Sequence, residues 1–169
     1  MIKMIVMDLD GTLLNDDESI SSYTISILEK CKEKGIKIVI ATGRSSLSAK
    51  EIIDLIKPDF SILNYGSLIL DENNVIIYIA AFSLGMPDEI FMYMGKMNAI
   101  EILSERQNIS LSEIVAFGDG FNDLEMIKYC GTGIAMENAP DTVKMFSKNI
   151  CGNNNEDGVA KWIEKNILI

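Results

Sequence analysis

The sequence predicts a single α/β domain built on a doubly wound, mainly parallel sheet. Short apolar, β-branched runs alternate with longer amphipathic runs, a pattern typical of parallel strands joined by covering helices. The chain of 169 residues is long enough to bury roughly 70% of the surface that its unfolded form exposes. We therefore expect residues 1–169 to form one domain around one core.

The expected elements follow one another along the chain. Five apolar runs are predicted to form the parallel strands: residues 3–7, 36–41, 60–63, 114–117 and 132–135. The runs 68–71 and 75–80, joined by Glu72-Asn73-Asn74, predict an antiparallel β-hairpin that is added to this sheet. Amphipathic spacing predicts helices over residues 19–34, 45–57, 98–107, 122–129, 141–146 and 159–167.

Breaker residues support these boundaries. Gly35 ends the first predicted helix, and Pro58 closes the second. Residues 82–95 are the hardest to assign, because they are rich in Met and Gly and are interrupted by Pro87.

The composition restricts the chemistry. A net charge of −10 argues against binding to nucleic acids or acidic membranes, since both attract lysines and arginines. The absence of histidine excludes histidine-based nucleophilic catalysis and most zinc sites. Carboxylates, lysine and a hard metal ion remain, and any phosphate site must supply its own local positive charge.

Features of cellular location are few. No apolar run approaches the ~20 residues of a membrane-spanning helix. The start of the chain lacks the long apolar stretch of a signal peptide. Cys31, Cys130 and Cys151 are odd in number and form no metal-ligand pattern, which predicts reduced thiols. We therefore expect a cytoplasmic protein.

Polar residues follow three of the predicted strands. Asp8 follows the first strand, Thr42 the second and Asp119 the fourth. Because ligands of open parallel sheets bind beyond the carboxyl ends of the strands, we expect these residues to converge on one site.

Asp8 and Asp10 form the first acidic pair. If the strand stays extended through Asp10, both side chains point to the same side, about 7 Å apart. Two carboxylates facing one small volume need a cation to relieve their repulsion, and an oxygen-rich site of this kind suits Mg²⁺. The alternative is a solvated turn, since Asp-Gly is a common turn signal.

The second acidic segment is Gly118-Asp119-Gly120-Phe121-Asn122-Asp123. Asp119 could bind a metal ion directly, while Asn122 and Asp123 position water, ligands or substrate. The alternative is helix capping by Asn or Asp within a tight glycine turn.

Thr42, Gly43 and Arg44 form a third candidate group. A hydroxyl and the N-terminal amides of the following helix would make a phosphate clamp, although Thr is also an ordinary helix cap. Arg44 is either a solvated helix residue or a ligand for a substrate carboxylate or phosphate.

These elements, in this order, resemble the haloacid-dehalogenase superfamily of phosphotransferases over nearly the whole chain. The segments that carry the resemblance are Asp8-Leu9-Asp10-Gly11-Thr12, Ala41-Thr42-Gly43-Arg44 and Gly118-Asp119-Gly120-Phe121-Asn122-Asp123. Three more segments resemble the Cof-type sugar-phosphatase branch: Leu124-Glu125-Met126, Gly133-Ile134-Ala135-Met136-Glu137-Asn138-Ala139 and Glu156-Asp157-Gly158-Val159-Ala160. The resemblance implies a Rossmann-like catalytic core.

The resemblance also implies roles for single residues. Asp8 would be the nucleophile that forms an aspartyl-phosphate, and Asp10 would protonate the leaving alcohol and then activate water. Mg²⁺ would be bound by Asp8, the backbone carbonyl of Asp10 and Asp119, with support from Asp123. Substrate or its phosphoryl group would be bound by Leu9, Thr42, Gly43, Arg44, Lys96 and Asn122.

The family's lysine motif is matched best by Lys96, which would contact the nucleophile and the phosphate. Many relatives carry glycine after this lysine, where Met97 stands in this chain. The alternative for Lys96 is a solvated lysine at a helix start.

The chain departs from the family in the expected cap domain. Cof-type members carry an α/β cap between the second motif and the lysine, and here only a short remnant, residues 82–93, stands in its place. The site would then be open to bulky substrates, or a second subunit would supply the missing wall, or turnover would be weak. Residues proposed for such a subunit contact, or merely for covering the core, are Met86, Phe91, Met92, Tyr93, Met94 and Met97.

The function predicted from these features is Mg²⁺-dependent hydrolysis of a small phosphate monoester, such as a sugar phosphate. One alternative is a phosphomutase or other phosphotransferase, which would have to shield the same intermediate from water. The other is a weakly active or non-catalytic relative that binds Mg²⁺ or phosphate.

Overall fold

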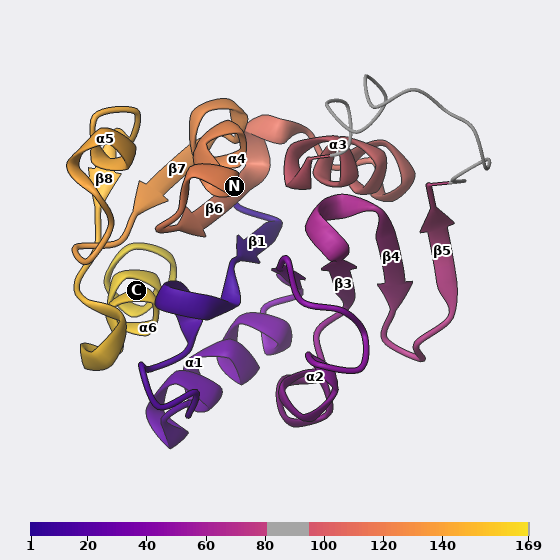
Figure 1. Cartoon of the computed structure of the whole chain (residues 1–169), viewed down its shortest axis with the longest axis horizontal. Coiled ribbons are helices and arrows are strands. Elements are labelled where there is room, and N and C mark those ends of the chain that lie inside the picture. Colours follow the sequence, from indigo (N-terminus) through magenta and orange to yellow (C-terminus); the bar gives the residue numbers. More distant parts are fainter. Residues whose placement is uncertain (81–94, 169) are drawn as a thin grey trace.

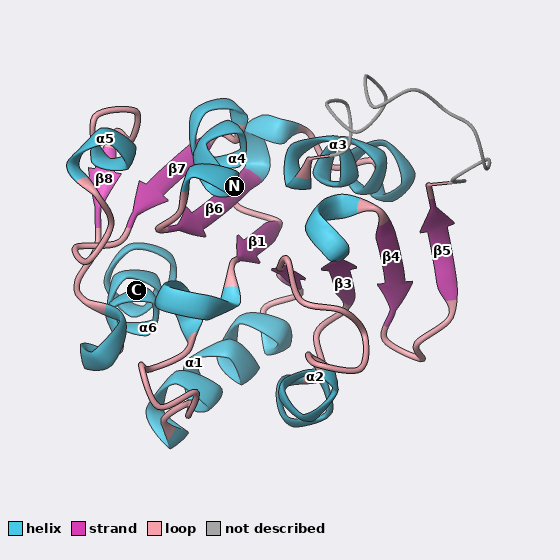
Figure 2. Ribbon diagram, in the orientation of Figure 1, coloured by secondary structure: helices cyan, strands magenta, loops and turns pink. Residues whose placement is uncertain are grey.

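A computed structural model describes residues 1–80 and 95–168 of the chain. It consists of one eight-stranded sheet with helices on both faces, so the predicted doubly wound α/β fold is confirmed (Figures 1 and 2). The strands are β1 (Met4–Met7), β2 (Lys37–Ala41), β3 (Phe60–Leu63), β4 (Leu68–Asp71), β5 (Ile76–Ile79), β6 (Ile114–Gly118), β7 (Thr132–Ala135) and β8 (Asn149–Ile150). The helices are α1 (Ser22–Glu33), α2 (Lys50–Ile56), α3 (Lys96–Gln107), α4 (Leu124–Tyr129), α5 (Asp141–Lys144) and α6 (Gly158–Ile163).

The strand order explains where a site can form. The order is β5-β4-β3-β2-β1-β6-β7-β8, with β3 to β8 parallel and β4 and β5 added as the predicted antiparallel hairpin. The chain builds outwards from β1 through β2 and β3, and later returns to the other side of β1 with β6. The carboxyl ends of β1, β2 and β6 therefore meet at the switch point of the sheet, where such folds bind ligands.

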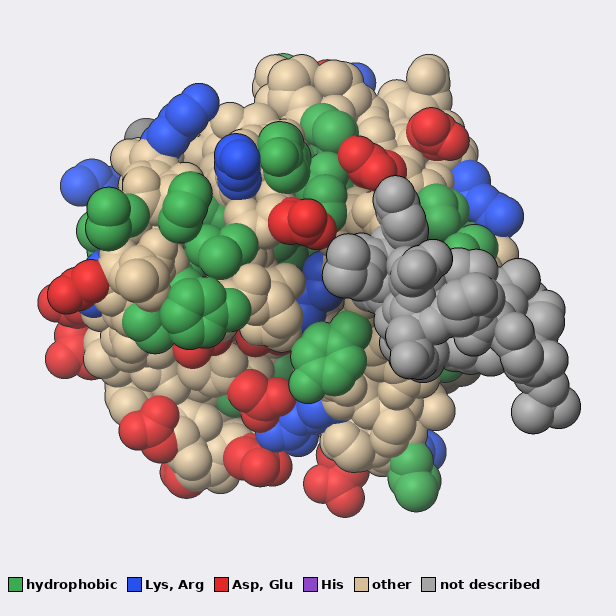
Figure 3. All heavy atoms as spheres, turned by 45° about the horizontal axis from the view of Figure 1, so that its top comes forward, with side chains coloured by type: hydrophobic (Ala, Val, Ile, Leu, Met, Phe, Trp, Pro, Cys, Tyr) green, Lys and Arg blue, Asp and Glu red, His purple; other side chains and the backbone are tan. Residues whose placement is uncertain are grey.

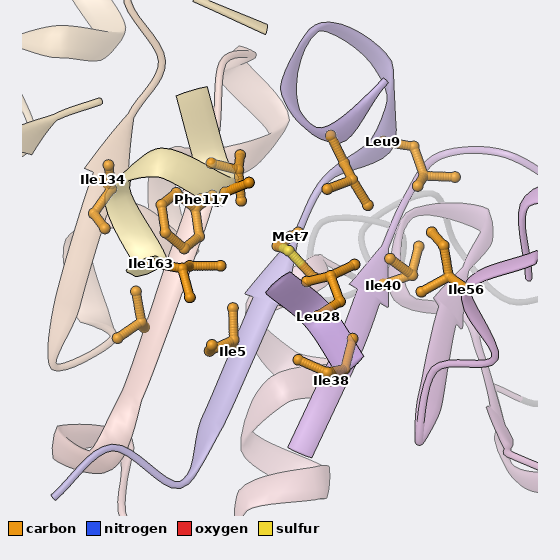
Figure 4. Packing of buried hydrophobic residues seen from close by; sticks show 14 of the residues in the cluster. Ile5, Met7, Leu9, Leu28, Ile38, Ile40, Ile56, Phe117, Ile134 and Ile163 are labelled. Carbon is orange, nitrogen blue, oxygen red and sulfur yellow. The ribbon is translucent and has the colours of Figure 1, made fainter. Parts of the chain in front are cut away.

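Alternate residues of the strands pack on opposite faces of the sheet. Ile5 and Met7 of β1 belong to a core that contains side chains of α1, α2 and α6 (Figure 4). Met4 and Val6 point to the other core, which contains side chains of α3 and α4. Because both faces are covered, the central strands are apolar throughout rather than alternating.

The aromatic pair Phe117 and Trp162 joins β6 to α6 in the first core. The two ring centroids are 5.5 Å apart at an interplanar angle of 81°, an edge-to-face contact. This contact fixes the carboxyl end of β6, one residue before Gly118, against the helix that covers it.

Some predicted boundaries are wrong. The second helix begins at Lys50 rather than at residue 45, because Ser45 accepts a hydrogen bond from Ser48 N–H through its hydroxyl and holds residues 45–49 in turns. The helix predicted over residues 98–107 starts two residues earlier than expected, because α3 begins at Lys96. The two-residue strand β8 was not predicted, since both of its side chains are exposed and give no apolar pattern.

The proposed cap remnant, residues 82–93, lies outside the described residues. Of the residues proposed for a subunit contact, only Met97 is described. Its side chain is 4% exposed and packs in the second core, which agrees with the alternative that it covers the core. Within residues 1–80 and 95–168, no helix has the length and hydrophobicity needed to cross a bilayer.

The three cysteines are free and buried in the structure. Burial raises the pKa of Cys31 to about 11 and those of Cys130 and Cys151 to about 12. Since the thiolate is the reactive form, these residues are packing groups rather than nucleophiles.

Candidate active site

The predicted site residues converge at the switch point of the sheet. Asp8, Thr42 and Asp119 directly follow β1, β2 and β6, which are neighbours in the sheet. A cleft of about 390 Å³ opens beside Asp8 and Asp119, while Thr42 is fully buried and does not line it. Its lining residues are Asp8, Asp10, Gly43, Arg44, Tyr65, Asp119, Gly120 and Asn122. On the face shown in Figure 3, acidic and basic side chains lie together around a central hollow.

The floor of the cleft contains a buried ion cluster. Lys96 Nζ donates hydrogen bonds to Asp8 Oδ1 at 2.7 Å and to Asp123 Oδ1 at 2.6 Å. All three side chains are almost completely buried. Lys96 therefore starts α3 as a buried ion-pair partner and not as a solvated lysine, and it joins residues that are 88 and 27 positions away in the sequence.

Asp123 also organises the loop that carries Asp119. Its Oδ2 accepts hydrogen bonds from the backbone N–H groups of Asp119, at 3.1 Å, and Gly120, at 2.9 Å. Asp123 thus caps the turn that precedes α4, which was the alternative considered for it, and it also binds Lys96.

Asp119 is held from the opposite side by the turn that follows β1. Thr12 Oγ1 donates a hydrogen bond to Asp119 Oδ1 over 3.0 Å. Gly11 allows this approach, because its φ is +71° and a Cβ atom there would lie 2.4 Å from Asp119 Oδ2. The glycine of the Asp-Gly-Thr segment is therefore required by the site.

Three carboxylates converge closely enough to hold a metal ion. One oxygen each from Asp8, Asp119 and Asp123 can be chosen so that all three lie within 4.8 Å of one another. An oxygen-only donor set of this kind fits a hard cation such as Mg²⁺.

Burial and neighbouring charges shift the pKa values of this cluster. Burial raises the pKa of Asp8 to about 7, and the charge of Asp123 adds to the rise while Lys96 opposes it. Burial also raises the pKa of Asp119. Burial lowers the pKa of Lys96, but the charges of Asp8 and Asp123 outweigh it and leave this pKa above its usual value. A divalent cation would favour the ionised carboxylates.

The expected position of Asp10 is wrong in one respect. The strand ends at Met7, and the chain then turns over residues 9–13, with a positive φ of 71° at Gly11, so the premise of a strand extended through Asp10 does not hold. Asp10 still lines the cleft, but its side chain is 56% exposed and pairs with Arg44. Arg44 Nε lies 3.0 Å from Asp10 Oδ2, and Arg44 Nη2 lies 3.3 Å from Glu18 Oε1.

The segment of residues 42–44, which follows β2, also differs from the predicted phosphate clamp. Thr42 is buried, and its hydroxyl oxygen accepts a hydrogen bond of 3.1 Å from Arg44 N–H. The predicted helix amides are absent here, because α2 starts eight residues after Thr42. Gly43 lines the cleft, whereas Thr42 is fully buried behind it.

The remaining predicted residues differ in how they reach the cleft. Asn122 lines it directly. The side chain of Leu9 is fully buried in the first core, which leaves only its backbone for a contact with substrate.

Three residues around the site were missed by sequence reasoning. Thr12 was quoted only as part of a motif, and Glu18 carries no local signal. Tyr65 lines the cleft after β3, where its position beyond a strand end could have indicated it.

Comparison with known proteins identifies the family. The sequence pattern of haloacid dehalogenase-like hydrolases matches residues 5–94 and 92–163. The 5-amino-6-(5-phospho-D-ribitylamino)uracil phosphatase YcsE of Bacillus subtilis (strain 168) is 27% identical over 240 aligned positions, which cover 99% of this chain and 96% of that protein. Since this chain has 169 residues, the alignment includes positions that have no counterpart here.

Solved structures agree with the fold. A haloacid dehalogenase-like hydrolase from Bacteroides thetaiotaomicron superimposes with a TM-score of 0.86 and 22% identity, covering 98% of this chain and 99% of that one. The subclass IIB sugar phosphatase BT4131 superimposes with a TM-score of 0.83 and 21% identity, covering 99% of this chain and 100% of that one. The family pattern, the curated relatives and these structures together confirm the predicted enzyme class and the Cof-type resemblance. The chain belongs to the haloacid dehalogenase-like hydrolase family.

Proposed function

We propose that this protein is a Mg²⁺-dependent phosphatase that hydrolyses a small phosphate monoester through an aspartyl-phosphate on Asp8. The observation that carries the proposal is the buried carboxylate of Asp8, which is hydrogen bonded to Lys96 and lies beside Asp119 and Asp123 at the floor of an open cleft. The phosphatase names of the relatives support the same class of substrate.

Each residue has a physical role in this reaction. Asp8 attacks phosphorus, and the hydrogen bond from Lys96 holds its carboxylate in place. Lys96 also supplies positive charge to the transferring group, while the Thr42 hydroxyl and Gly43 backbone are available to bind its oxygens. Asp8, Asp119 and Asp123 would hold Mg²⁺. The chemistry supplied by the bound ion is neutralisation of charge between the carboxylates and the phosphoryl oxygens.

Asp10 is the proposed acid for the leaving alcohol and the base for the attacking water. In the structure it is paired with Arg44, so it must exchange this partner for the leaving-group oxygen during the reaction. The carboxylate of Asp10 is 56% exposed, so water can solvate it during this movement, while Arg44 keeps Glu18 as a partner.

We also propose that the chain is one catalytic core in which a short segment, residues 82–93, replaces a cap domain. The two matches to the family pattern, which meet at residues 92–94, support a break at this place. The open cleft then leaves leaving-group recognition to residues of the core.

The Asp8→Asn variant tests the proposed mechanism. We expect wild-type protein to hydrolyse 4-nitrophenyl phosphate with Mg²⁺. The variant should lose at least about a thousandfold in kcat, since it removes the nucleophile but keeps the shape. Asp54→Asn, an exposed change on α2, is the matched control and should retain full activity. Release of inorganic phosphate is the measurement.

The outcomes separate the competing functions. Equal activity in wild type and Asp8→Asn would exclude the nucleophile role. Binding of Mg²⁺ without turnover by wild type would favour a non-catalytic relative. Transfer of the phosphoryl group to an added alcohol in preference to water would favour a phosphotransferase.

A further inference from the structure

Tyr65 combines a strained backbone with a place at the mouth of the cleft. It lies in the turn Asn64–Gly66 between β3 and β4, with φ 55° and ψ 28°. This left-handed conformation suits glycine and is strained for a bulky side chain. A turn that needed only its backbone shape would be more stable with glycine at this position.

The ring of Tyr65 is held against the phosphate-binding loop. A Cβ atom at position 43 would lie 2.5 Å from ring atoms Cε1 and Cζ of Tyr65, so only glycine allows the ring to lie on the backbone here. The ring is therefore supported on one side by Gly43, the proposed neighbour of the phosphate. Arg44, the next residue, lines the same cleft.

The other side of the ring is available to a ligand. The Tyr65 residue is 57% exposed although it is packed on Gly43, and it lines the cleft together with Asp8 and Asp10. A supported aromatic surface beside a reacting group gains most from a flat partner, since offset stacking of rings adds to the burial of apolar area.

From this geometry we infer that Tyr65 is a specificity-determining residue, a platform on which a planar aromatic or heteroaromatic leaving group stacks while its phosphate lies over Asp8. The inference rests on the proposed phosphatase function and deepens it by naming the substrate class. It also gives a reason for the strained backbone of Tyr65, because glycine at this position would have no ring on which a substrate could stack.

Binding measurements test the platform independently of turnover. In an Asp8→Asn background with Mg²⁺, calorimetry would compare pyridoxine 5′-phosphate, which has a flat ring one carbon from the phosphate ester oxygen, with glycerol 3-phosphate. We expect the flat ligand to bind roughly tenfold more tightly, as loss of one stacking contact typically changes affinity by this much or more. Tyr65→Leu should remove the preference, while Tyr65→Phe should keep it.

A matched control and a folding measurement complete the experiment. Tyr129→Leu makes the same change at a residue of similar exposure on α4 outside the cleft, and it should keep the preference. Tyr65→Gly should lose the preference while thermal unfolding shows equal or higher stability, which excludes misfolding as the cause. Equal affinities for the two ligands in the Tyr65-containing protein, or a preference that survives Tyr65→Leu, would overturn the inference.

Turnover by wild type then distinguishes this inference from the proposed function. Stacking preference without hydrolysis of either ester would contradict the phosphatase proposal alone. Hydrolysis of both esters with the same KM would contradict the Tyr65 platform alone.

Discussion

Two ion clusters at the same cleft differ in almost every physical property. The floor cluster of Asp8, Lys96 and Asp123 is buried, and Lys96 bridges both carboxylates. The rim cluster consists of Asp10, Arg44 and Glu18, whose carboxylates are 56% and 70% exposed. Buried pairs are rigid and costly to break, whereas exposed pairs are screened by water and salt. The difference indicates a preorganised floor for phosphorus and a rim that can rearrange around the leaving group.

The largest effect should come from breaking the floor cluster. Lys96→Met leaves two carboxylates buried without their cation, and we expect the free energy of unfolding to fall by about 3–5 kcal/mol. Urea unfolding in EDTA measures this loss. Lys161→Met, a change on the exposed surface of α6, should stay within about 0.5 kcal/mol of wild type. A Lys96→Met protein as stable as the control would show that the floor cluster is not the rigid element described here.

Binding of Mg²⁺ at the floor of the cleft should have a smaller effect on the free energy of unfolding. Because Mg²⁺ would bind the folded chain only, a concentration one hundred times its Kd should raise the free energy of unfolding by about 2.7 kcal/mol. Asp119→Asn should lose most of this stabilisation, while its stability in EDTA should equal or exceed that of wild type, since one of three converging negative charges is removed. Asp54→Asn should keep the full response. An undiminished Mg²⁺ response in Asp119→Asn would place the ion elsewhere.

The smallest effect should come from the rim. A double-mutant cycle of Asp10→Asn and Arg44→Gln should give a coupling free energy below about 1 kcal/mol, which decreases further in 0.5 M salt. Urea unfolding of the four proteins supplies the values. A coupling free energy between Asp10 and Arg44 as large as the loss of about 3–5 kcal/mol expected for Lys96→Met would contradict the distinction between the two clusters.

Sequence reasoning predicted the elements that depend on local patterns. The central strands were correct because they are continuous apolar runs. Asp8 and Asp119 were placed near one site because each follows the end of a strand, whereas Lys96 was placed there through the family resemblance. The ion pair of Asp10 with Arg44 was not predictable, since the direction of the Asp10 side chain depends on where β1 stops and on the positive φ of Gly11. Tyr65 was missed because its contact with Gly43 joins two separate loops.

The contact between Phe117 and Trp162 has a practical consequence. Trp162 is the single tryptophan of the chain, so the indole fluorescence comes from one known position. Its ring meets Phe117, and the carbonyl of Phe117 accepts a hydrogen bond of 3.1 Å from the N–H of Asp8. The protein therefore contains an intrinsic optical reporter connected to the backbone of the candidate nucleophile through one intervening residue.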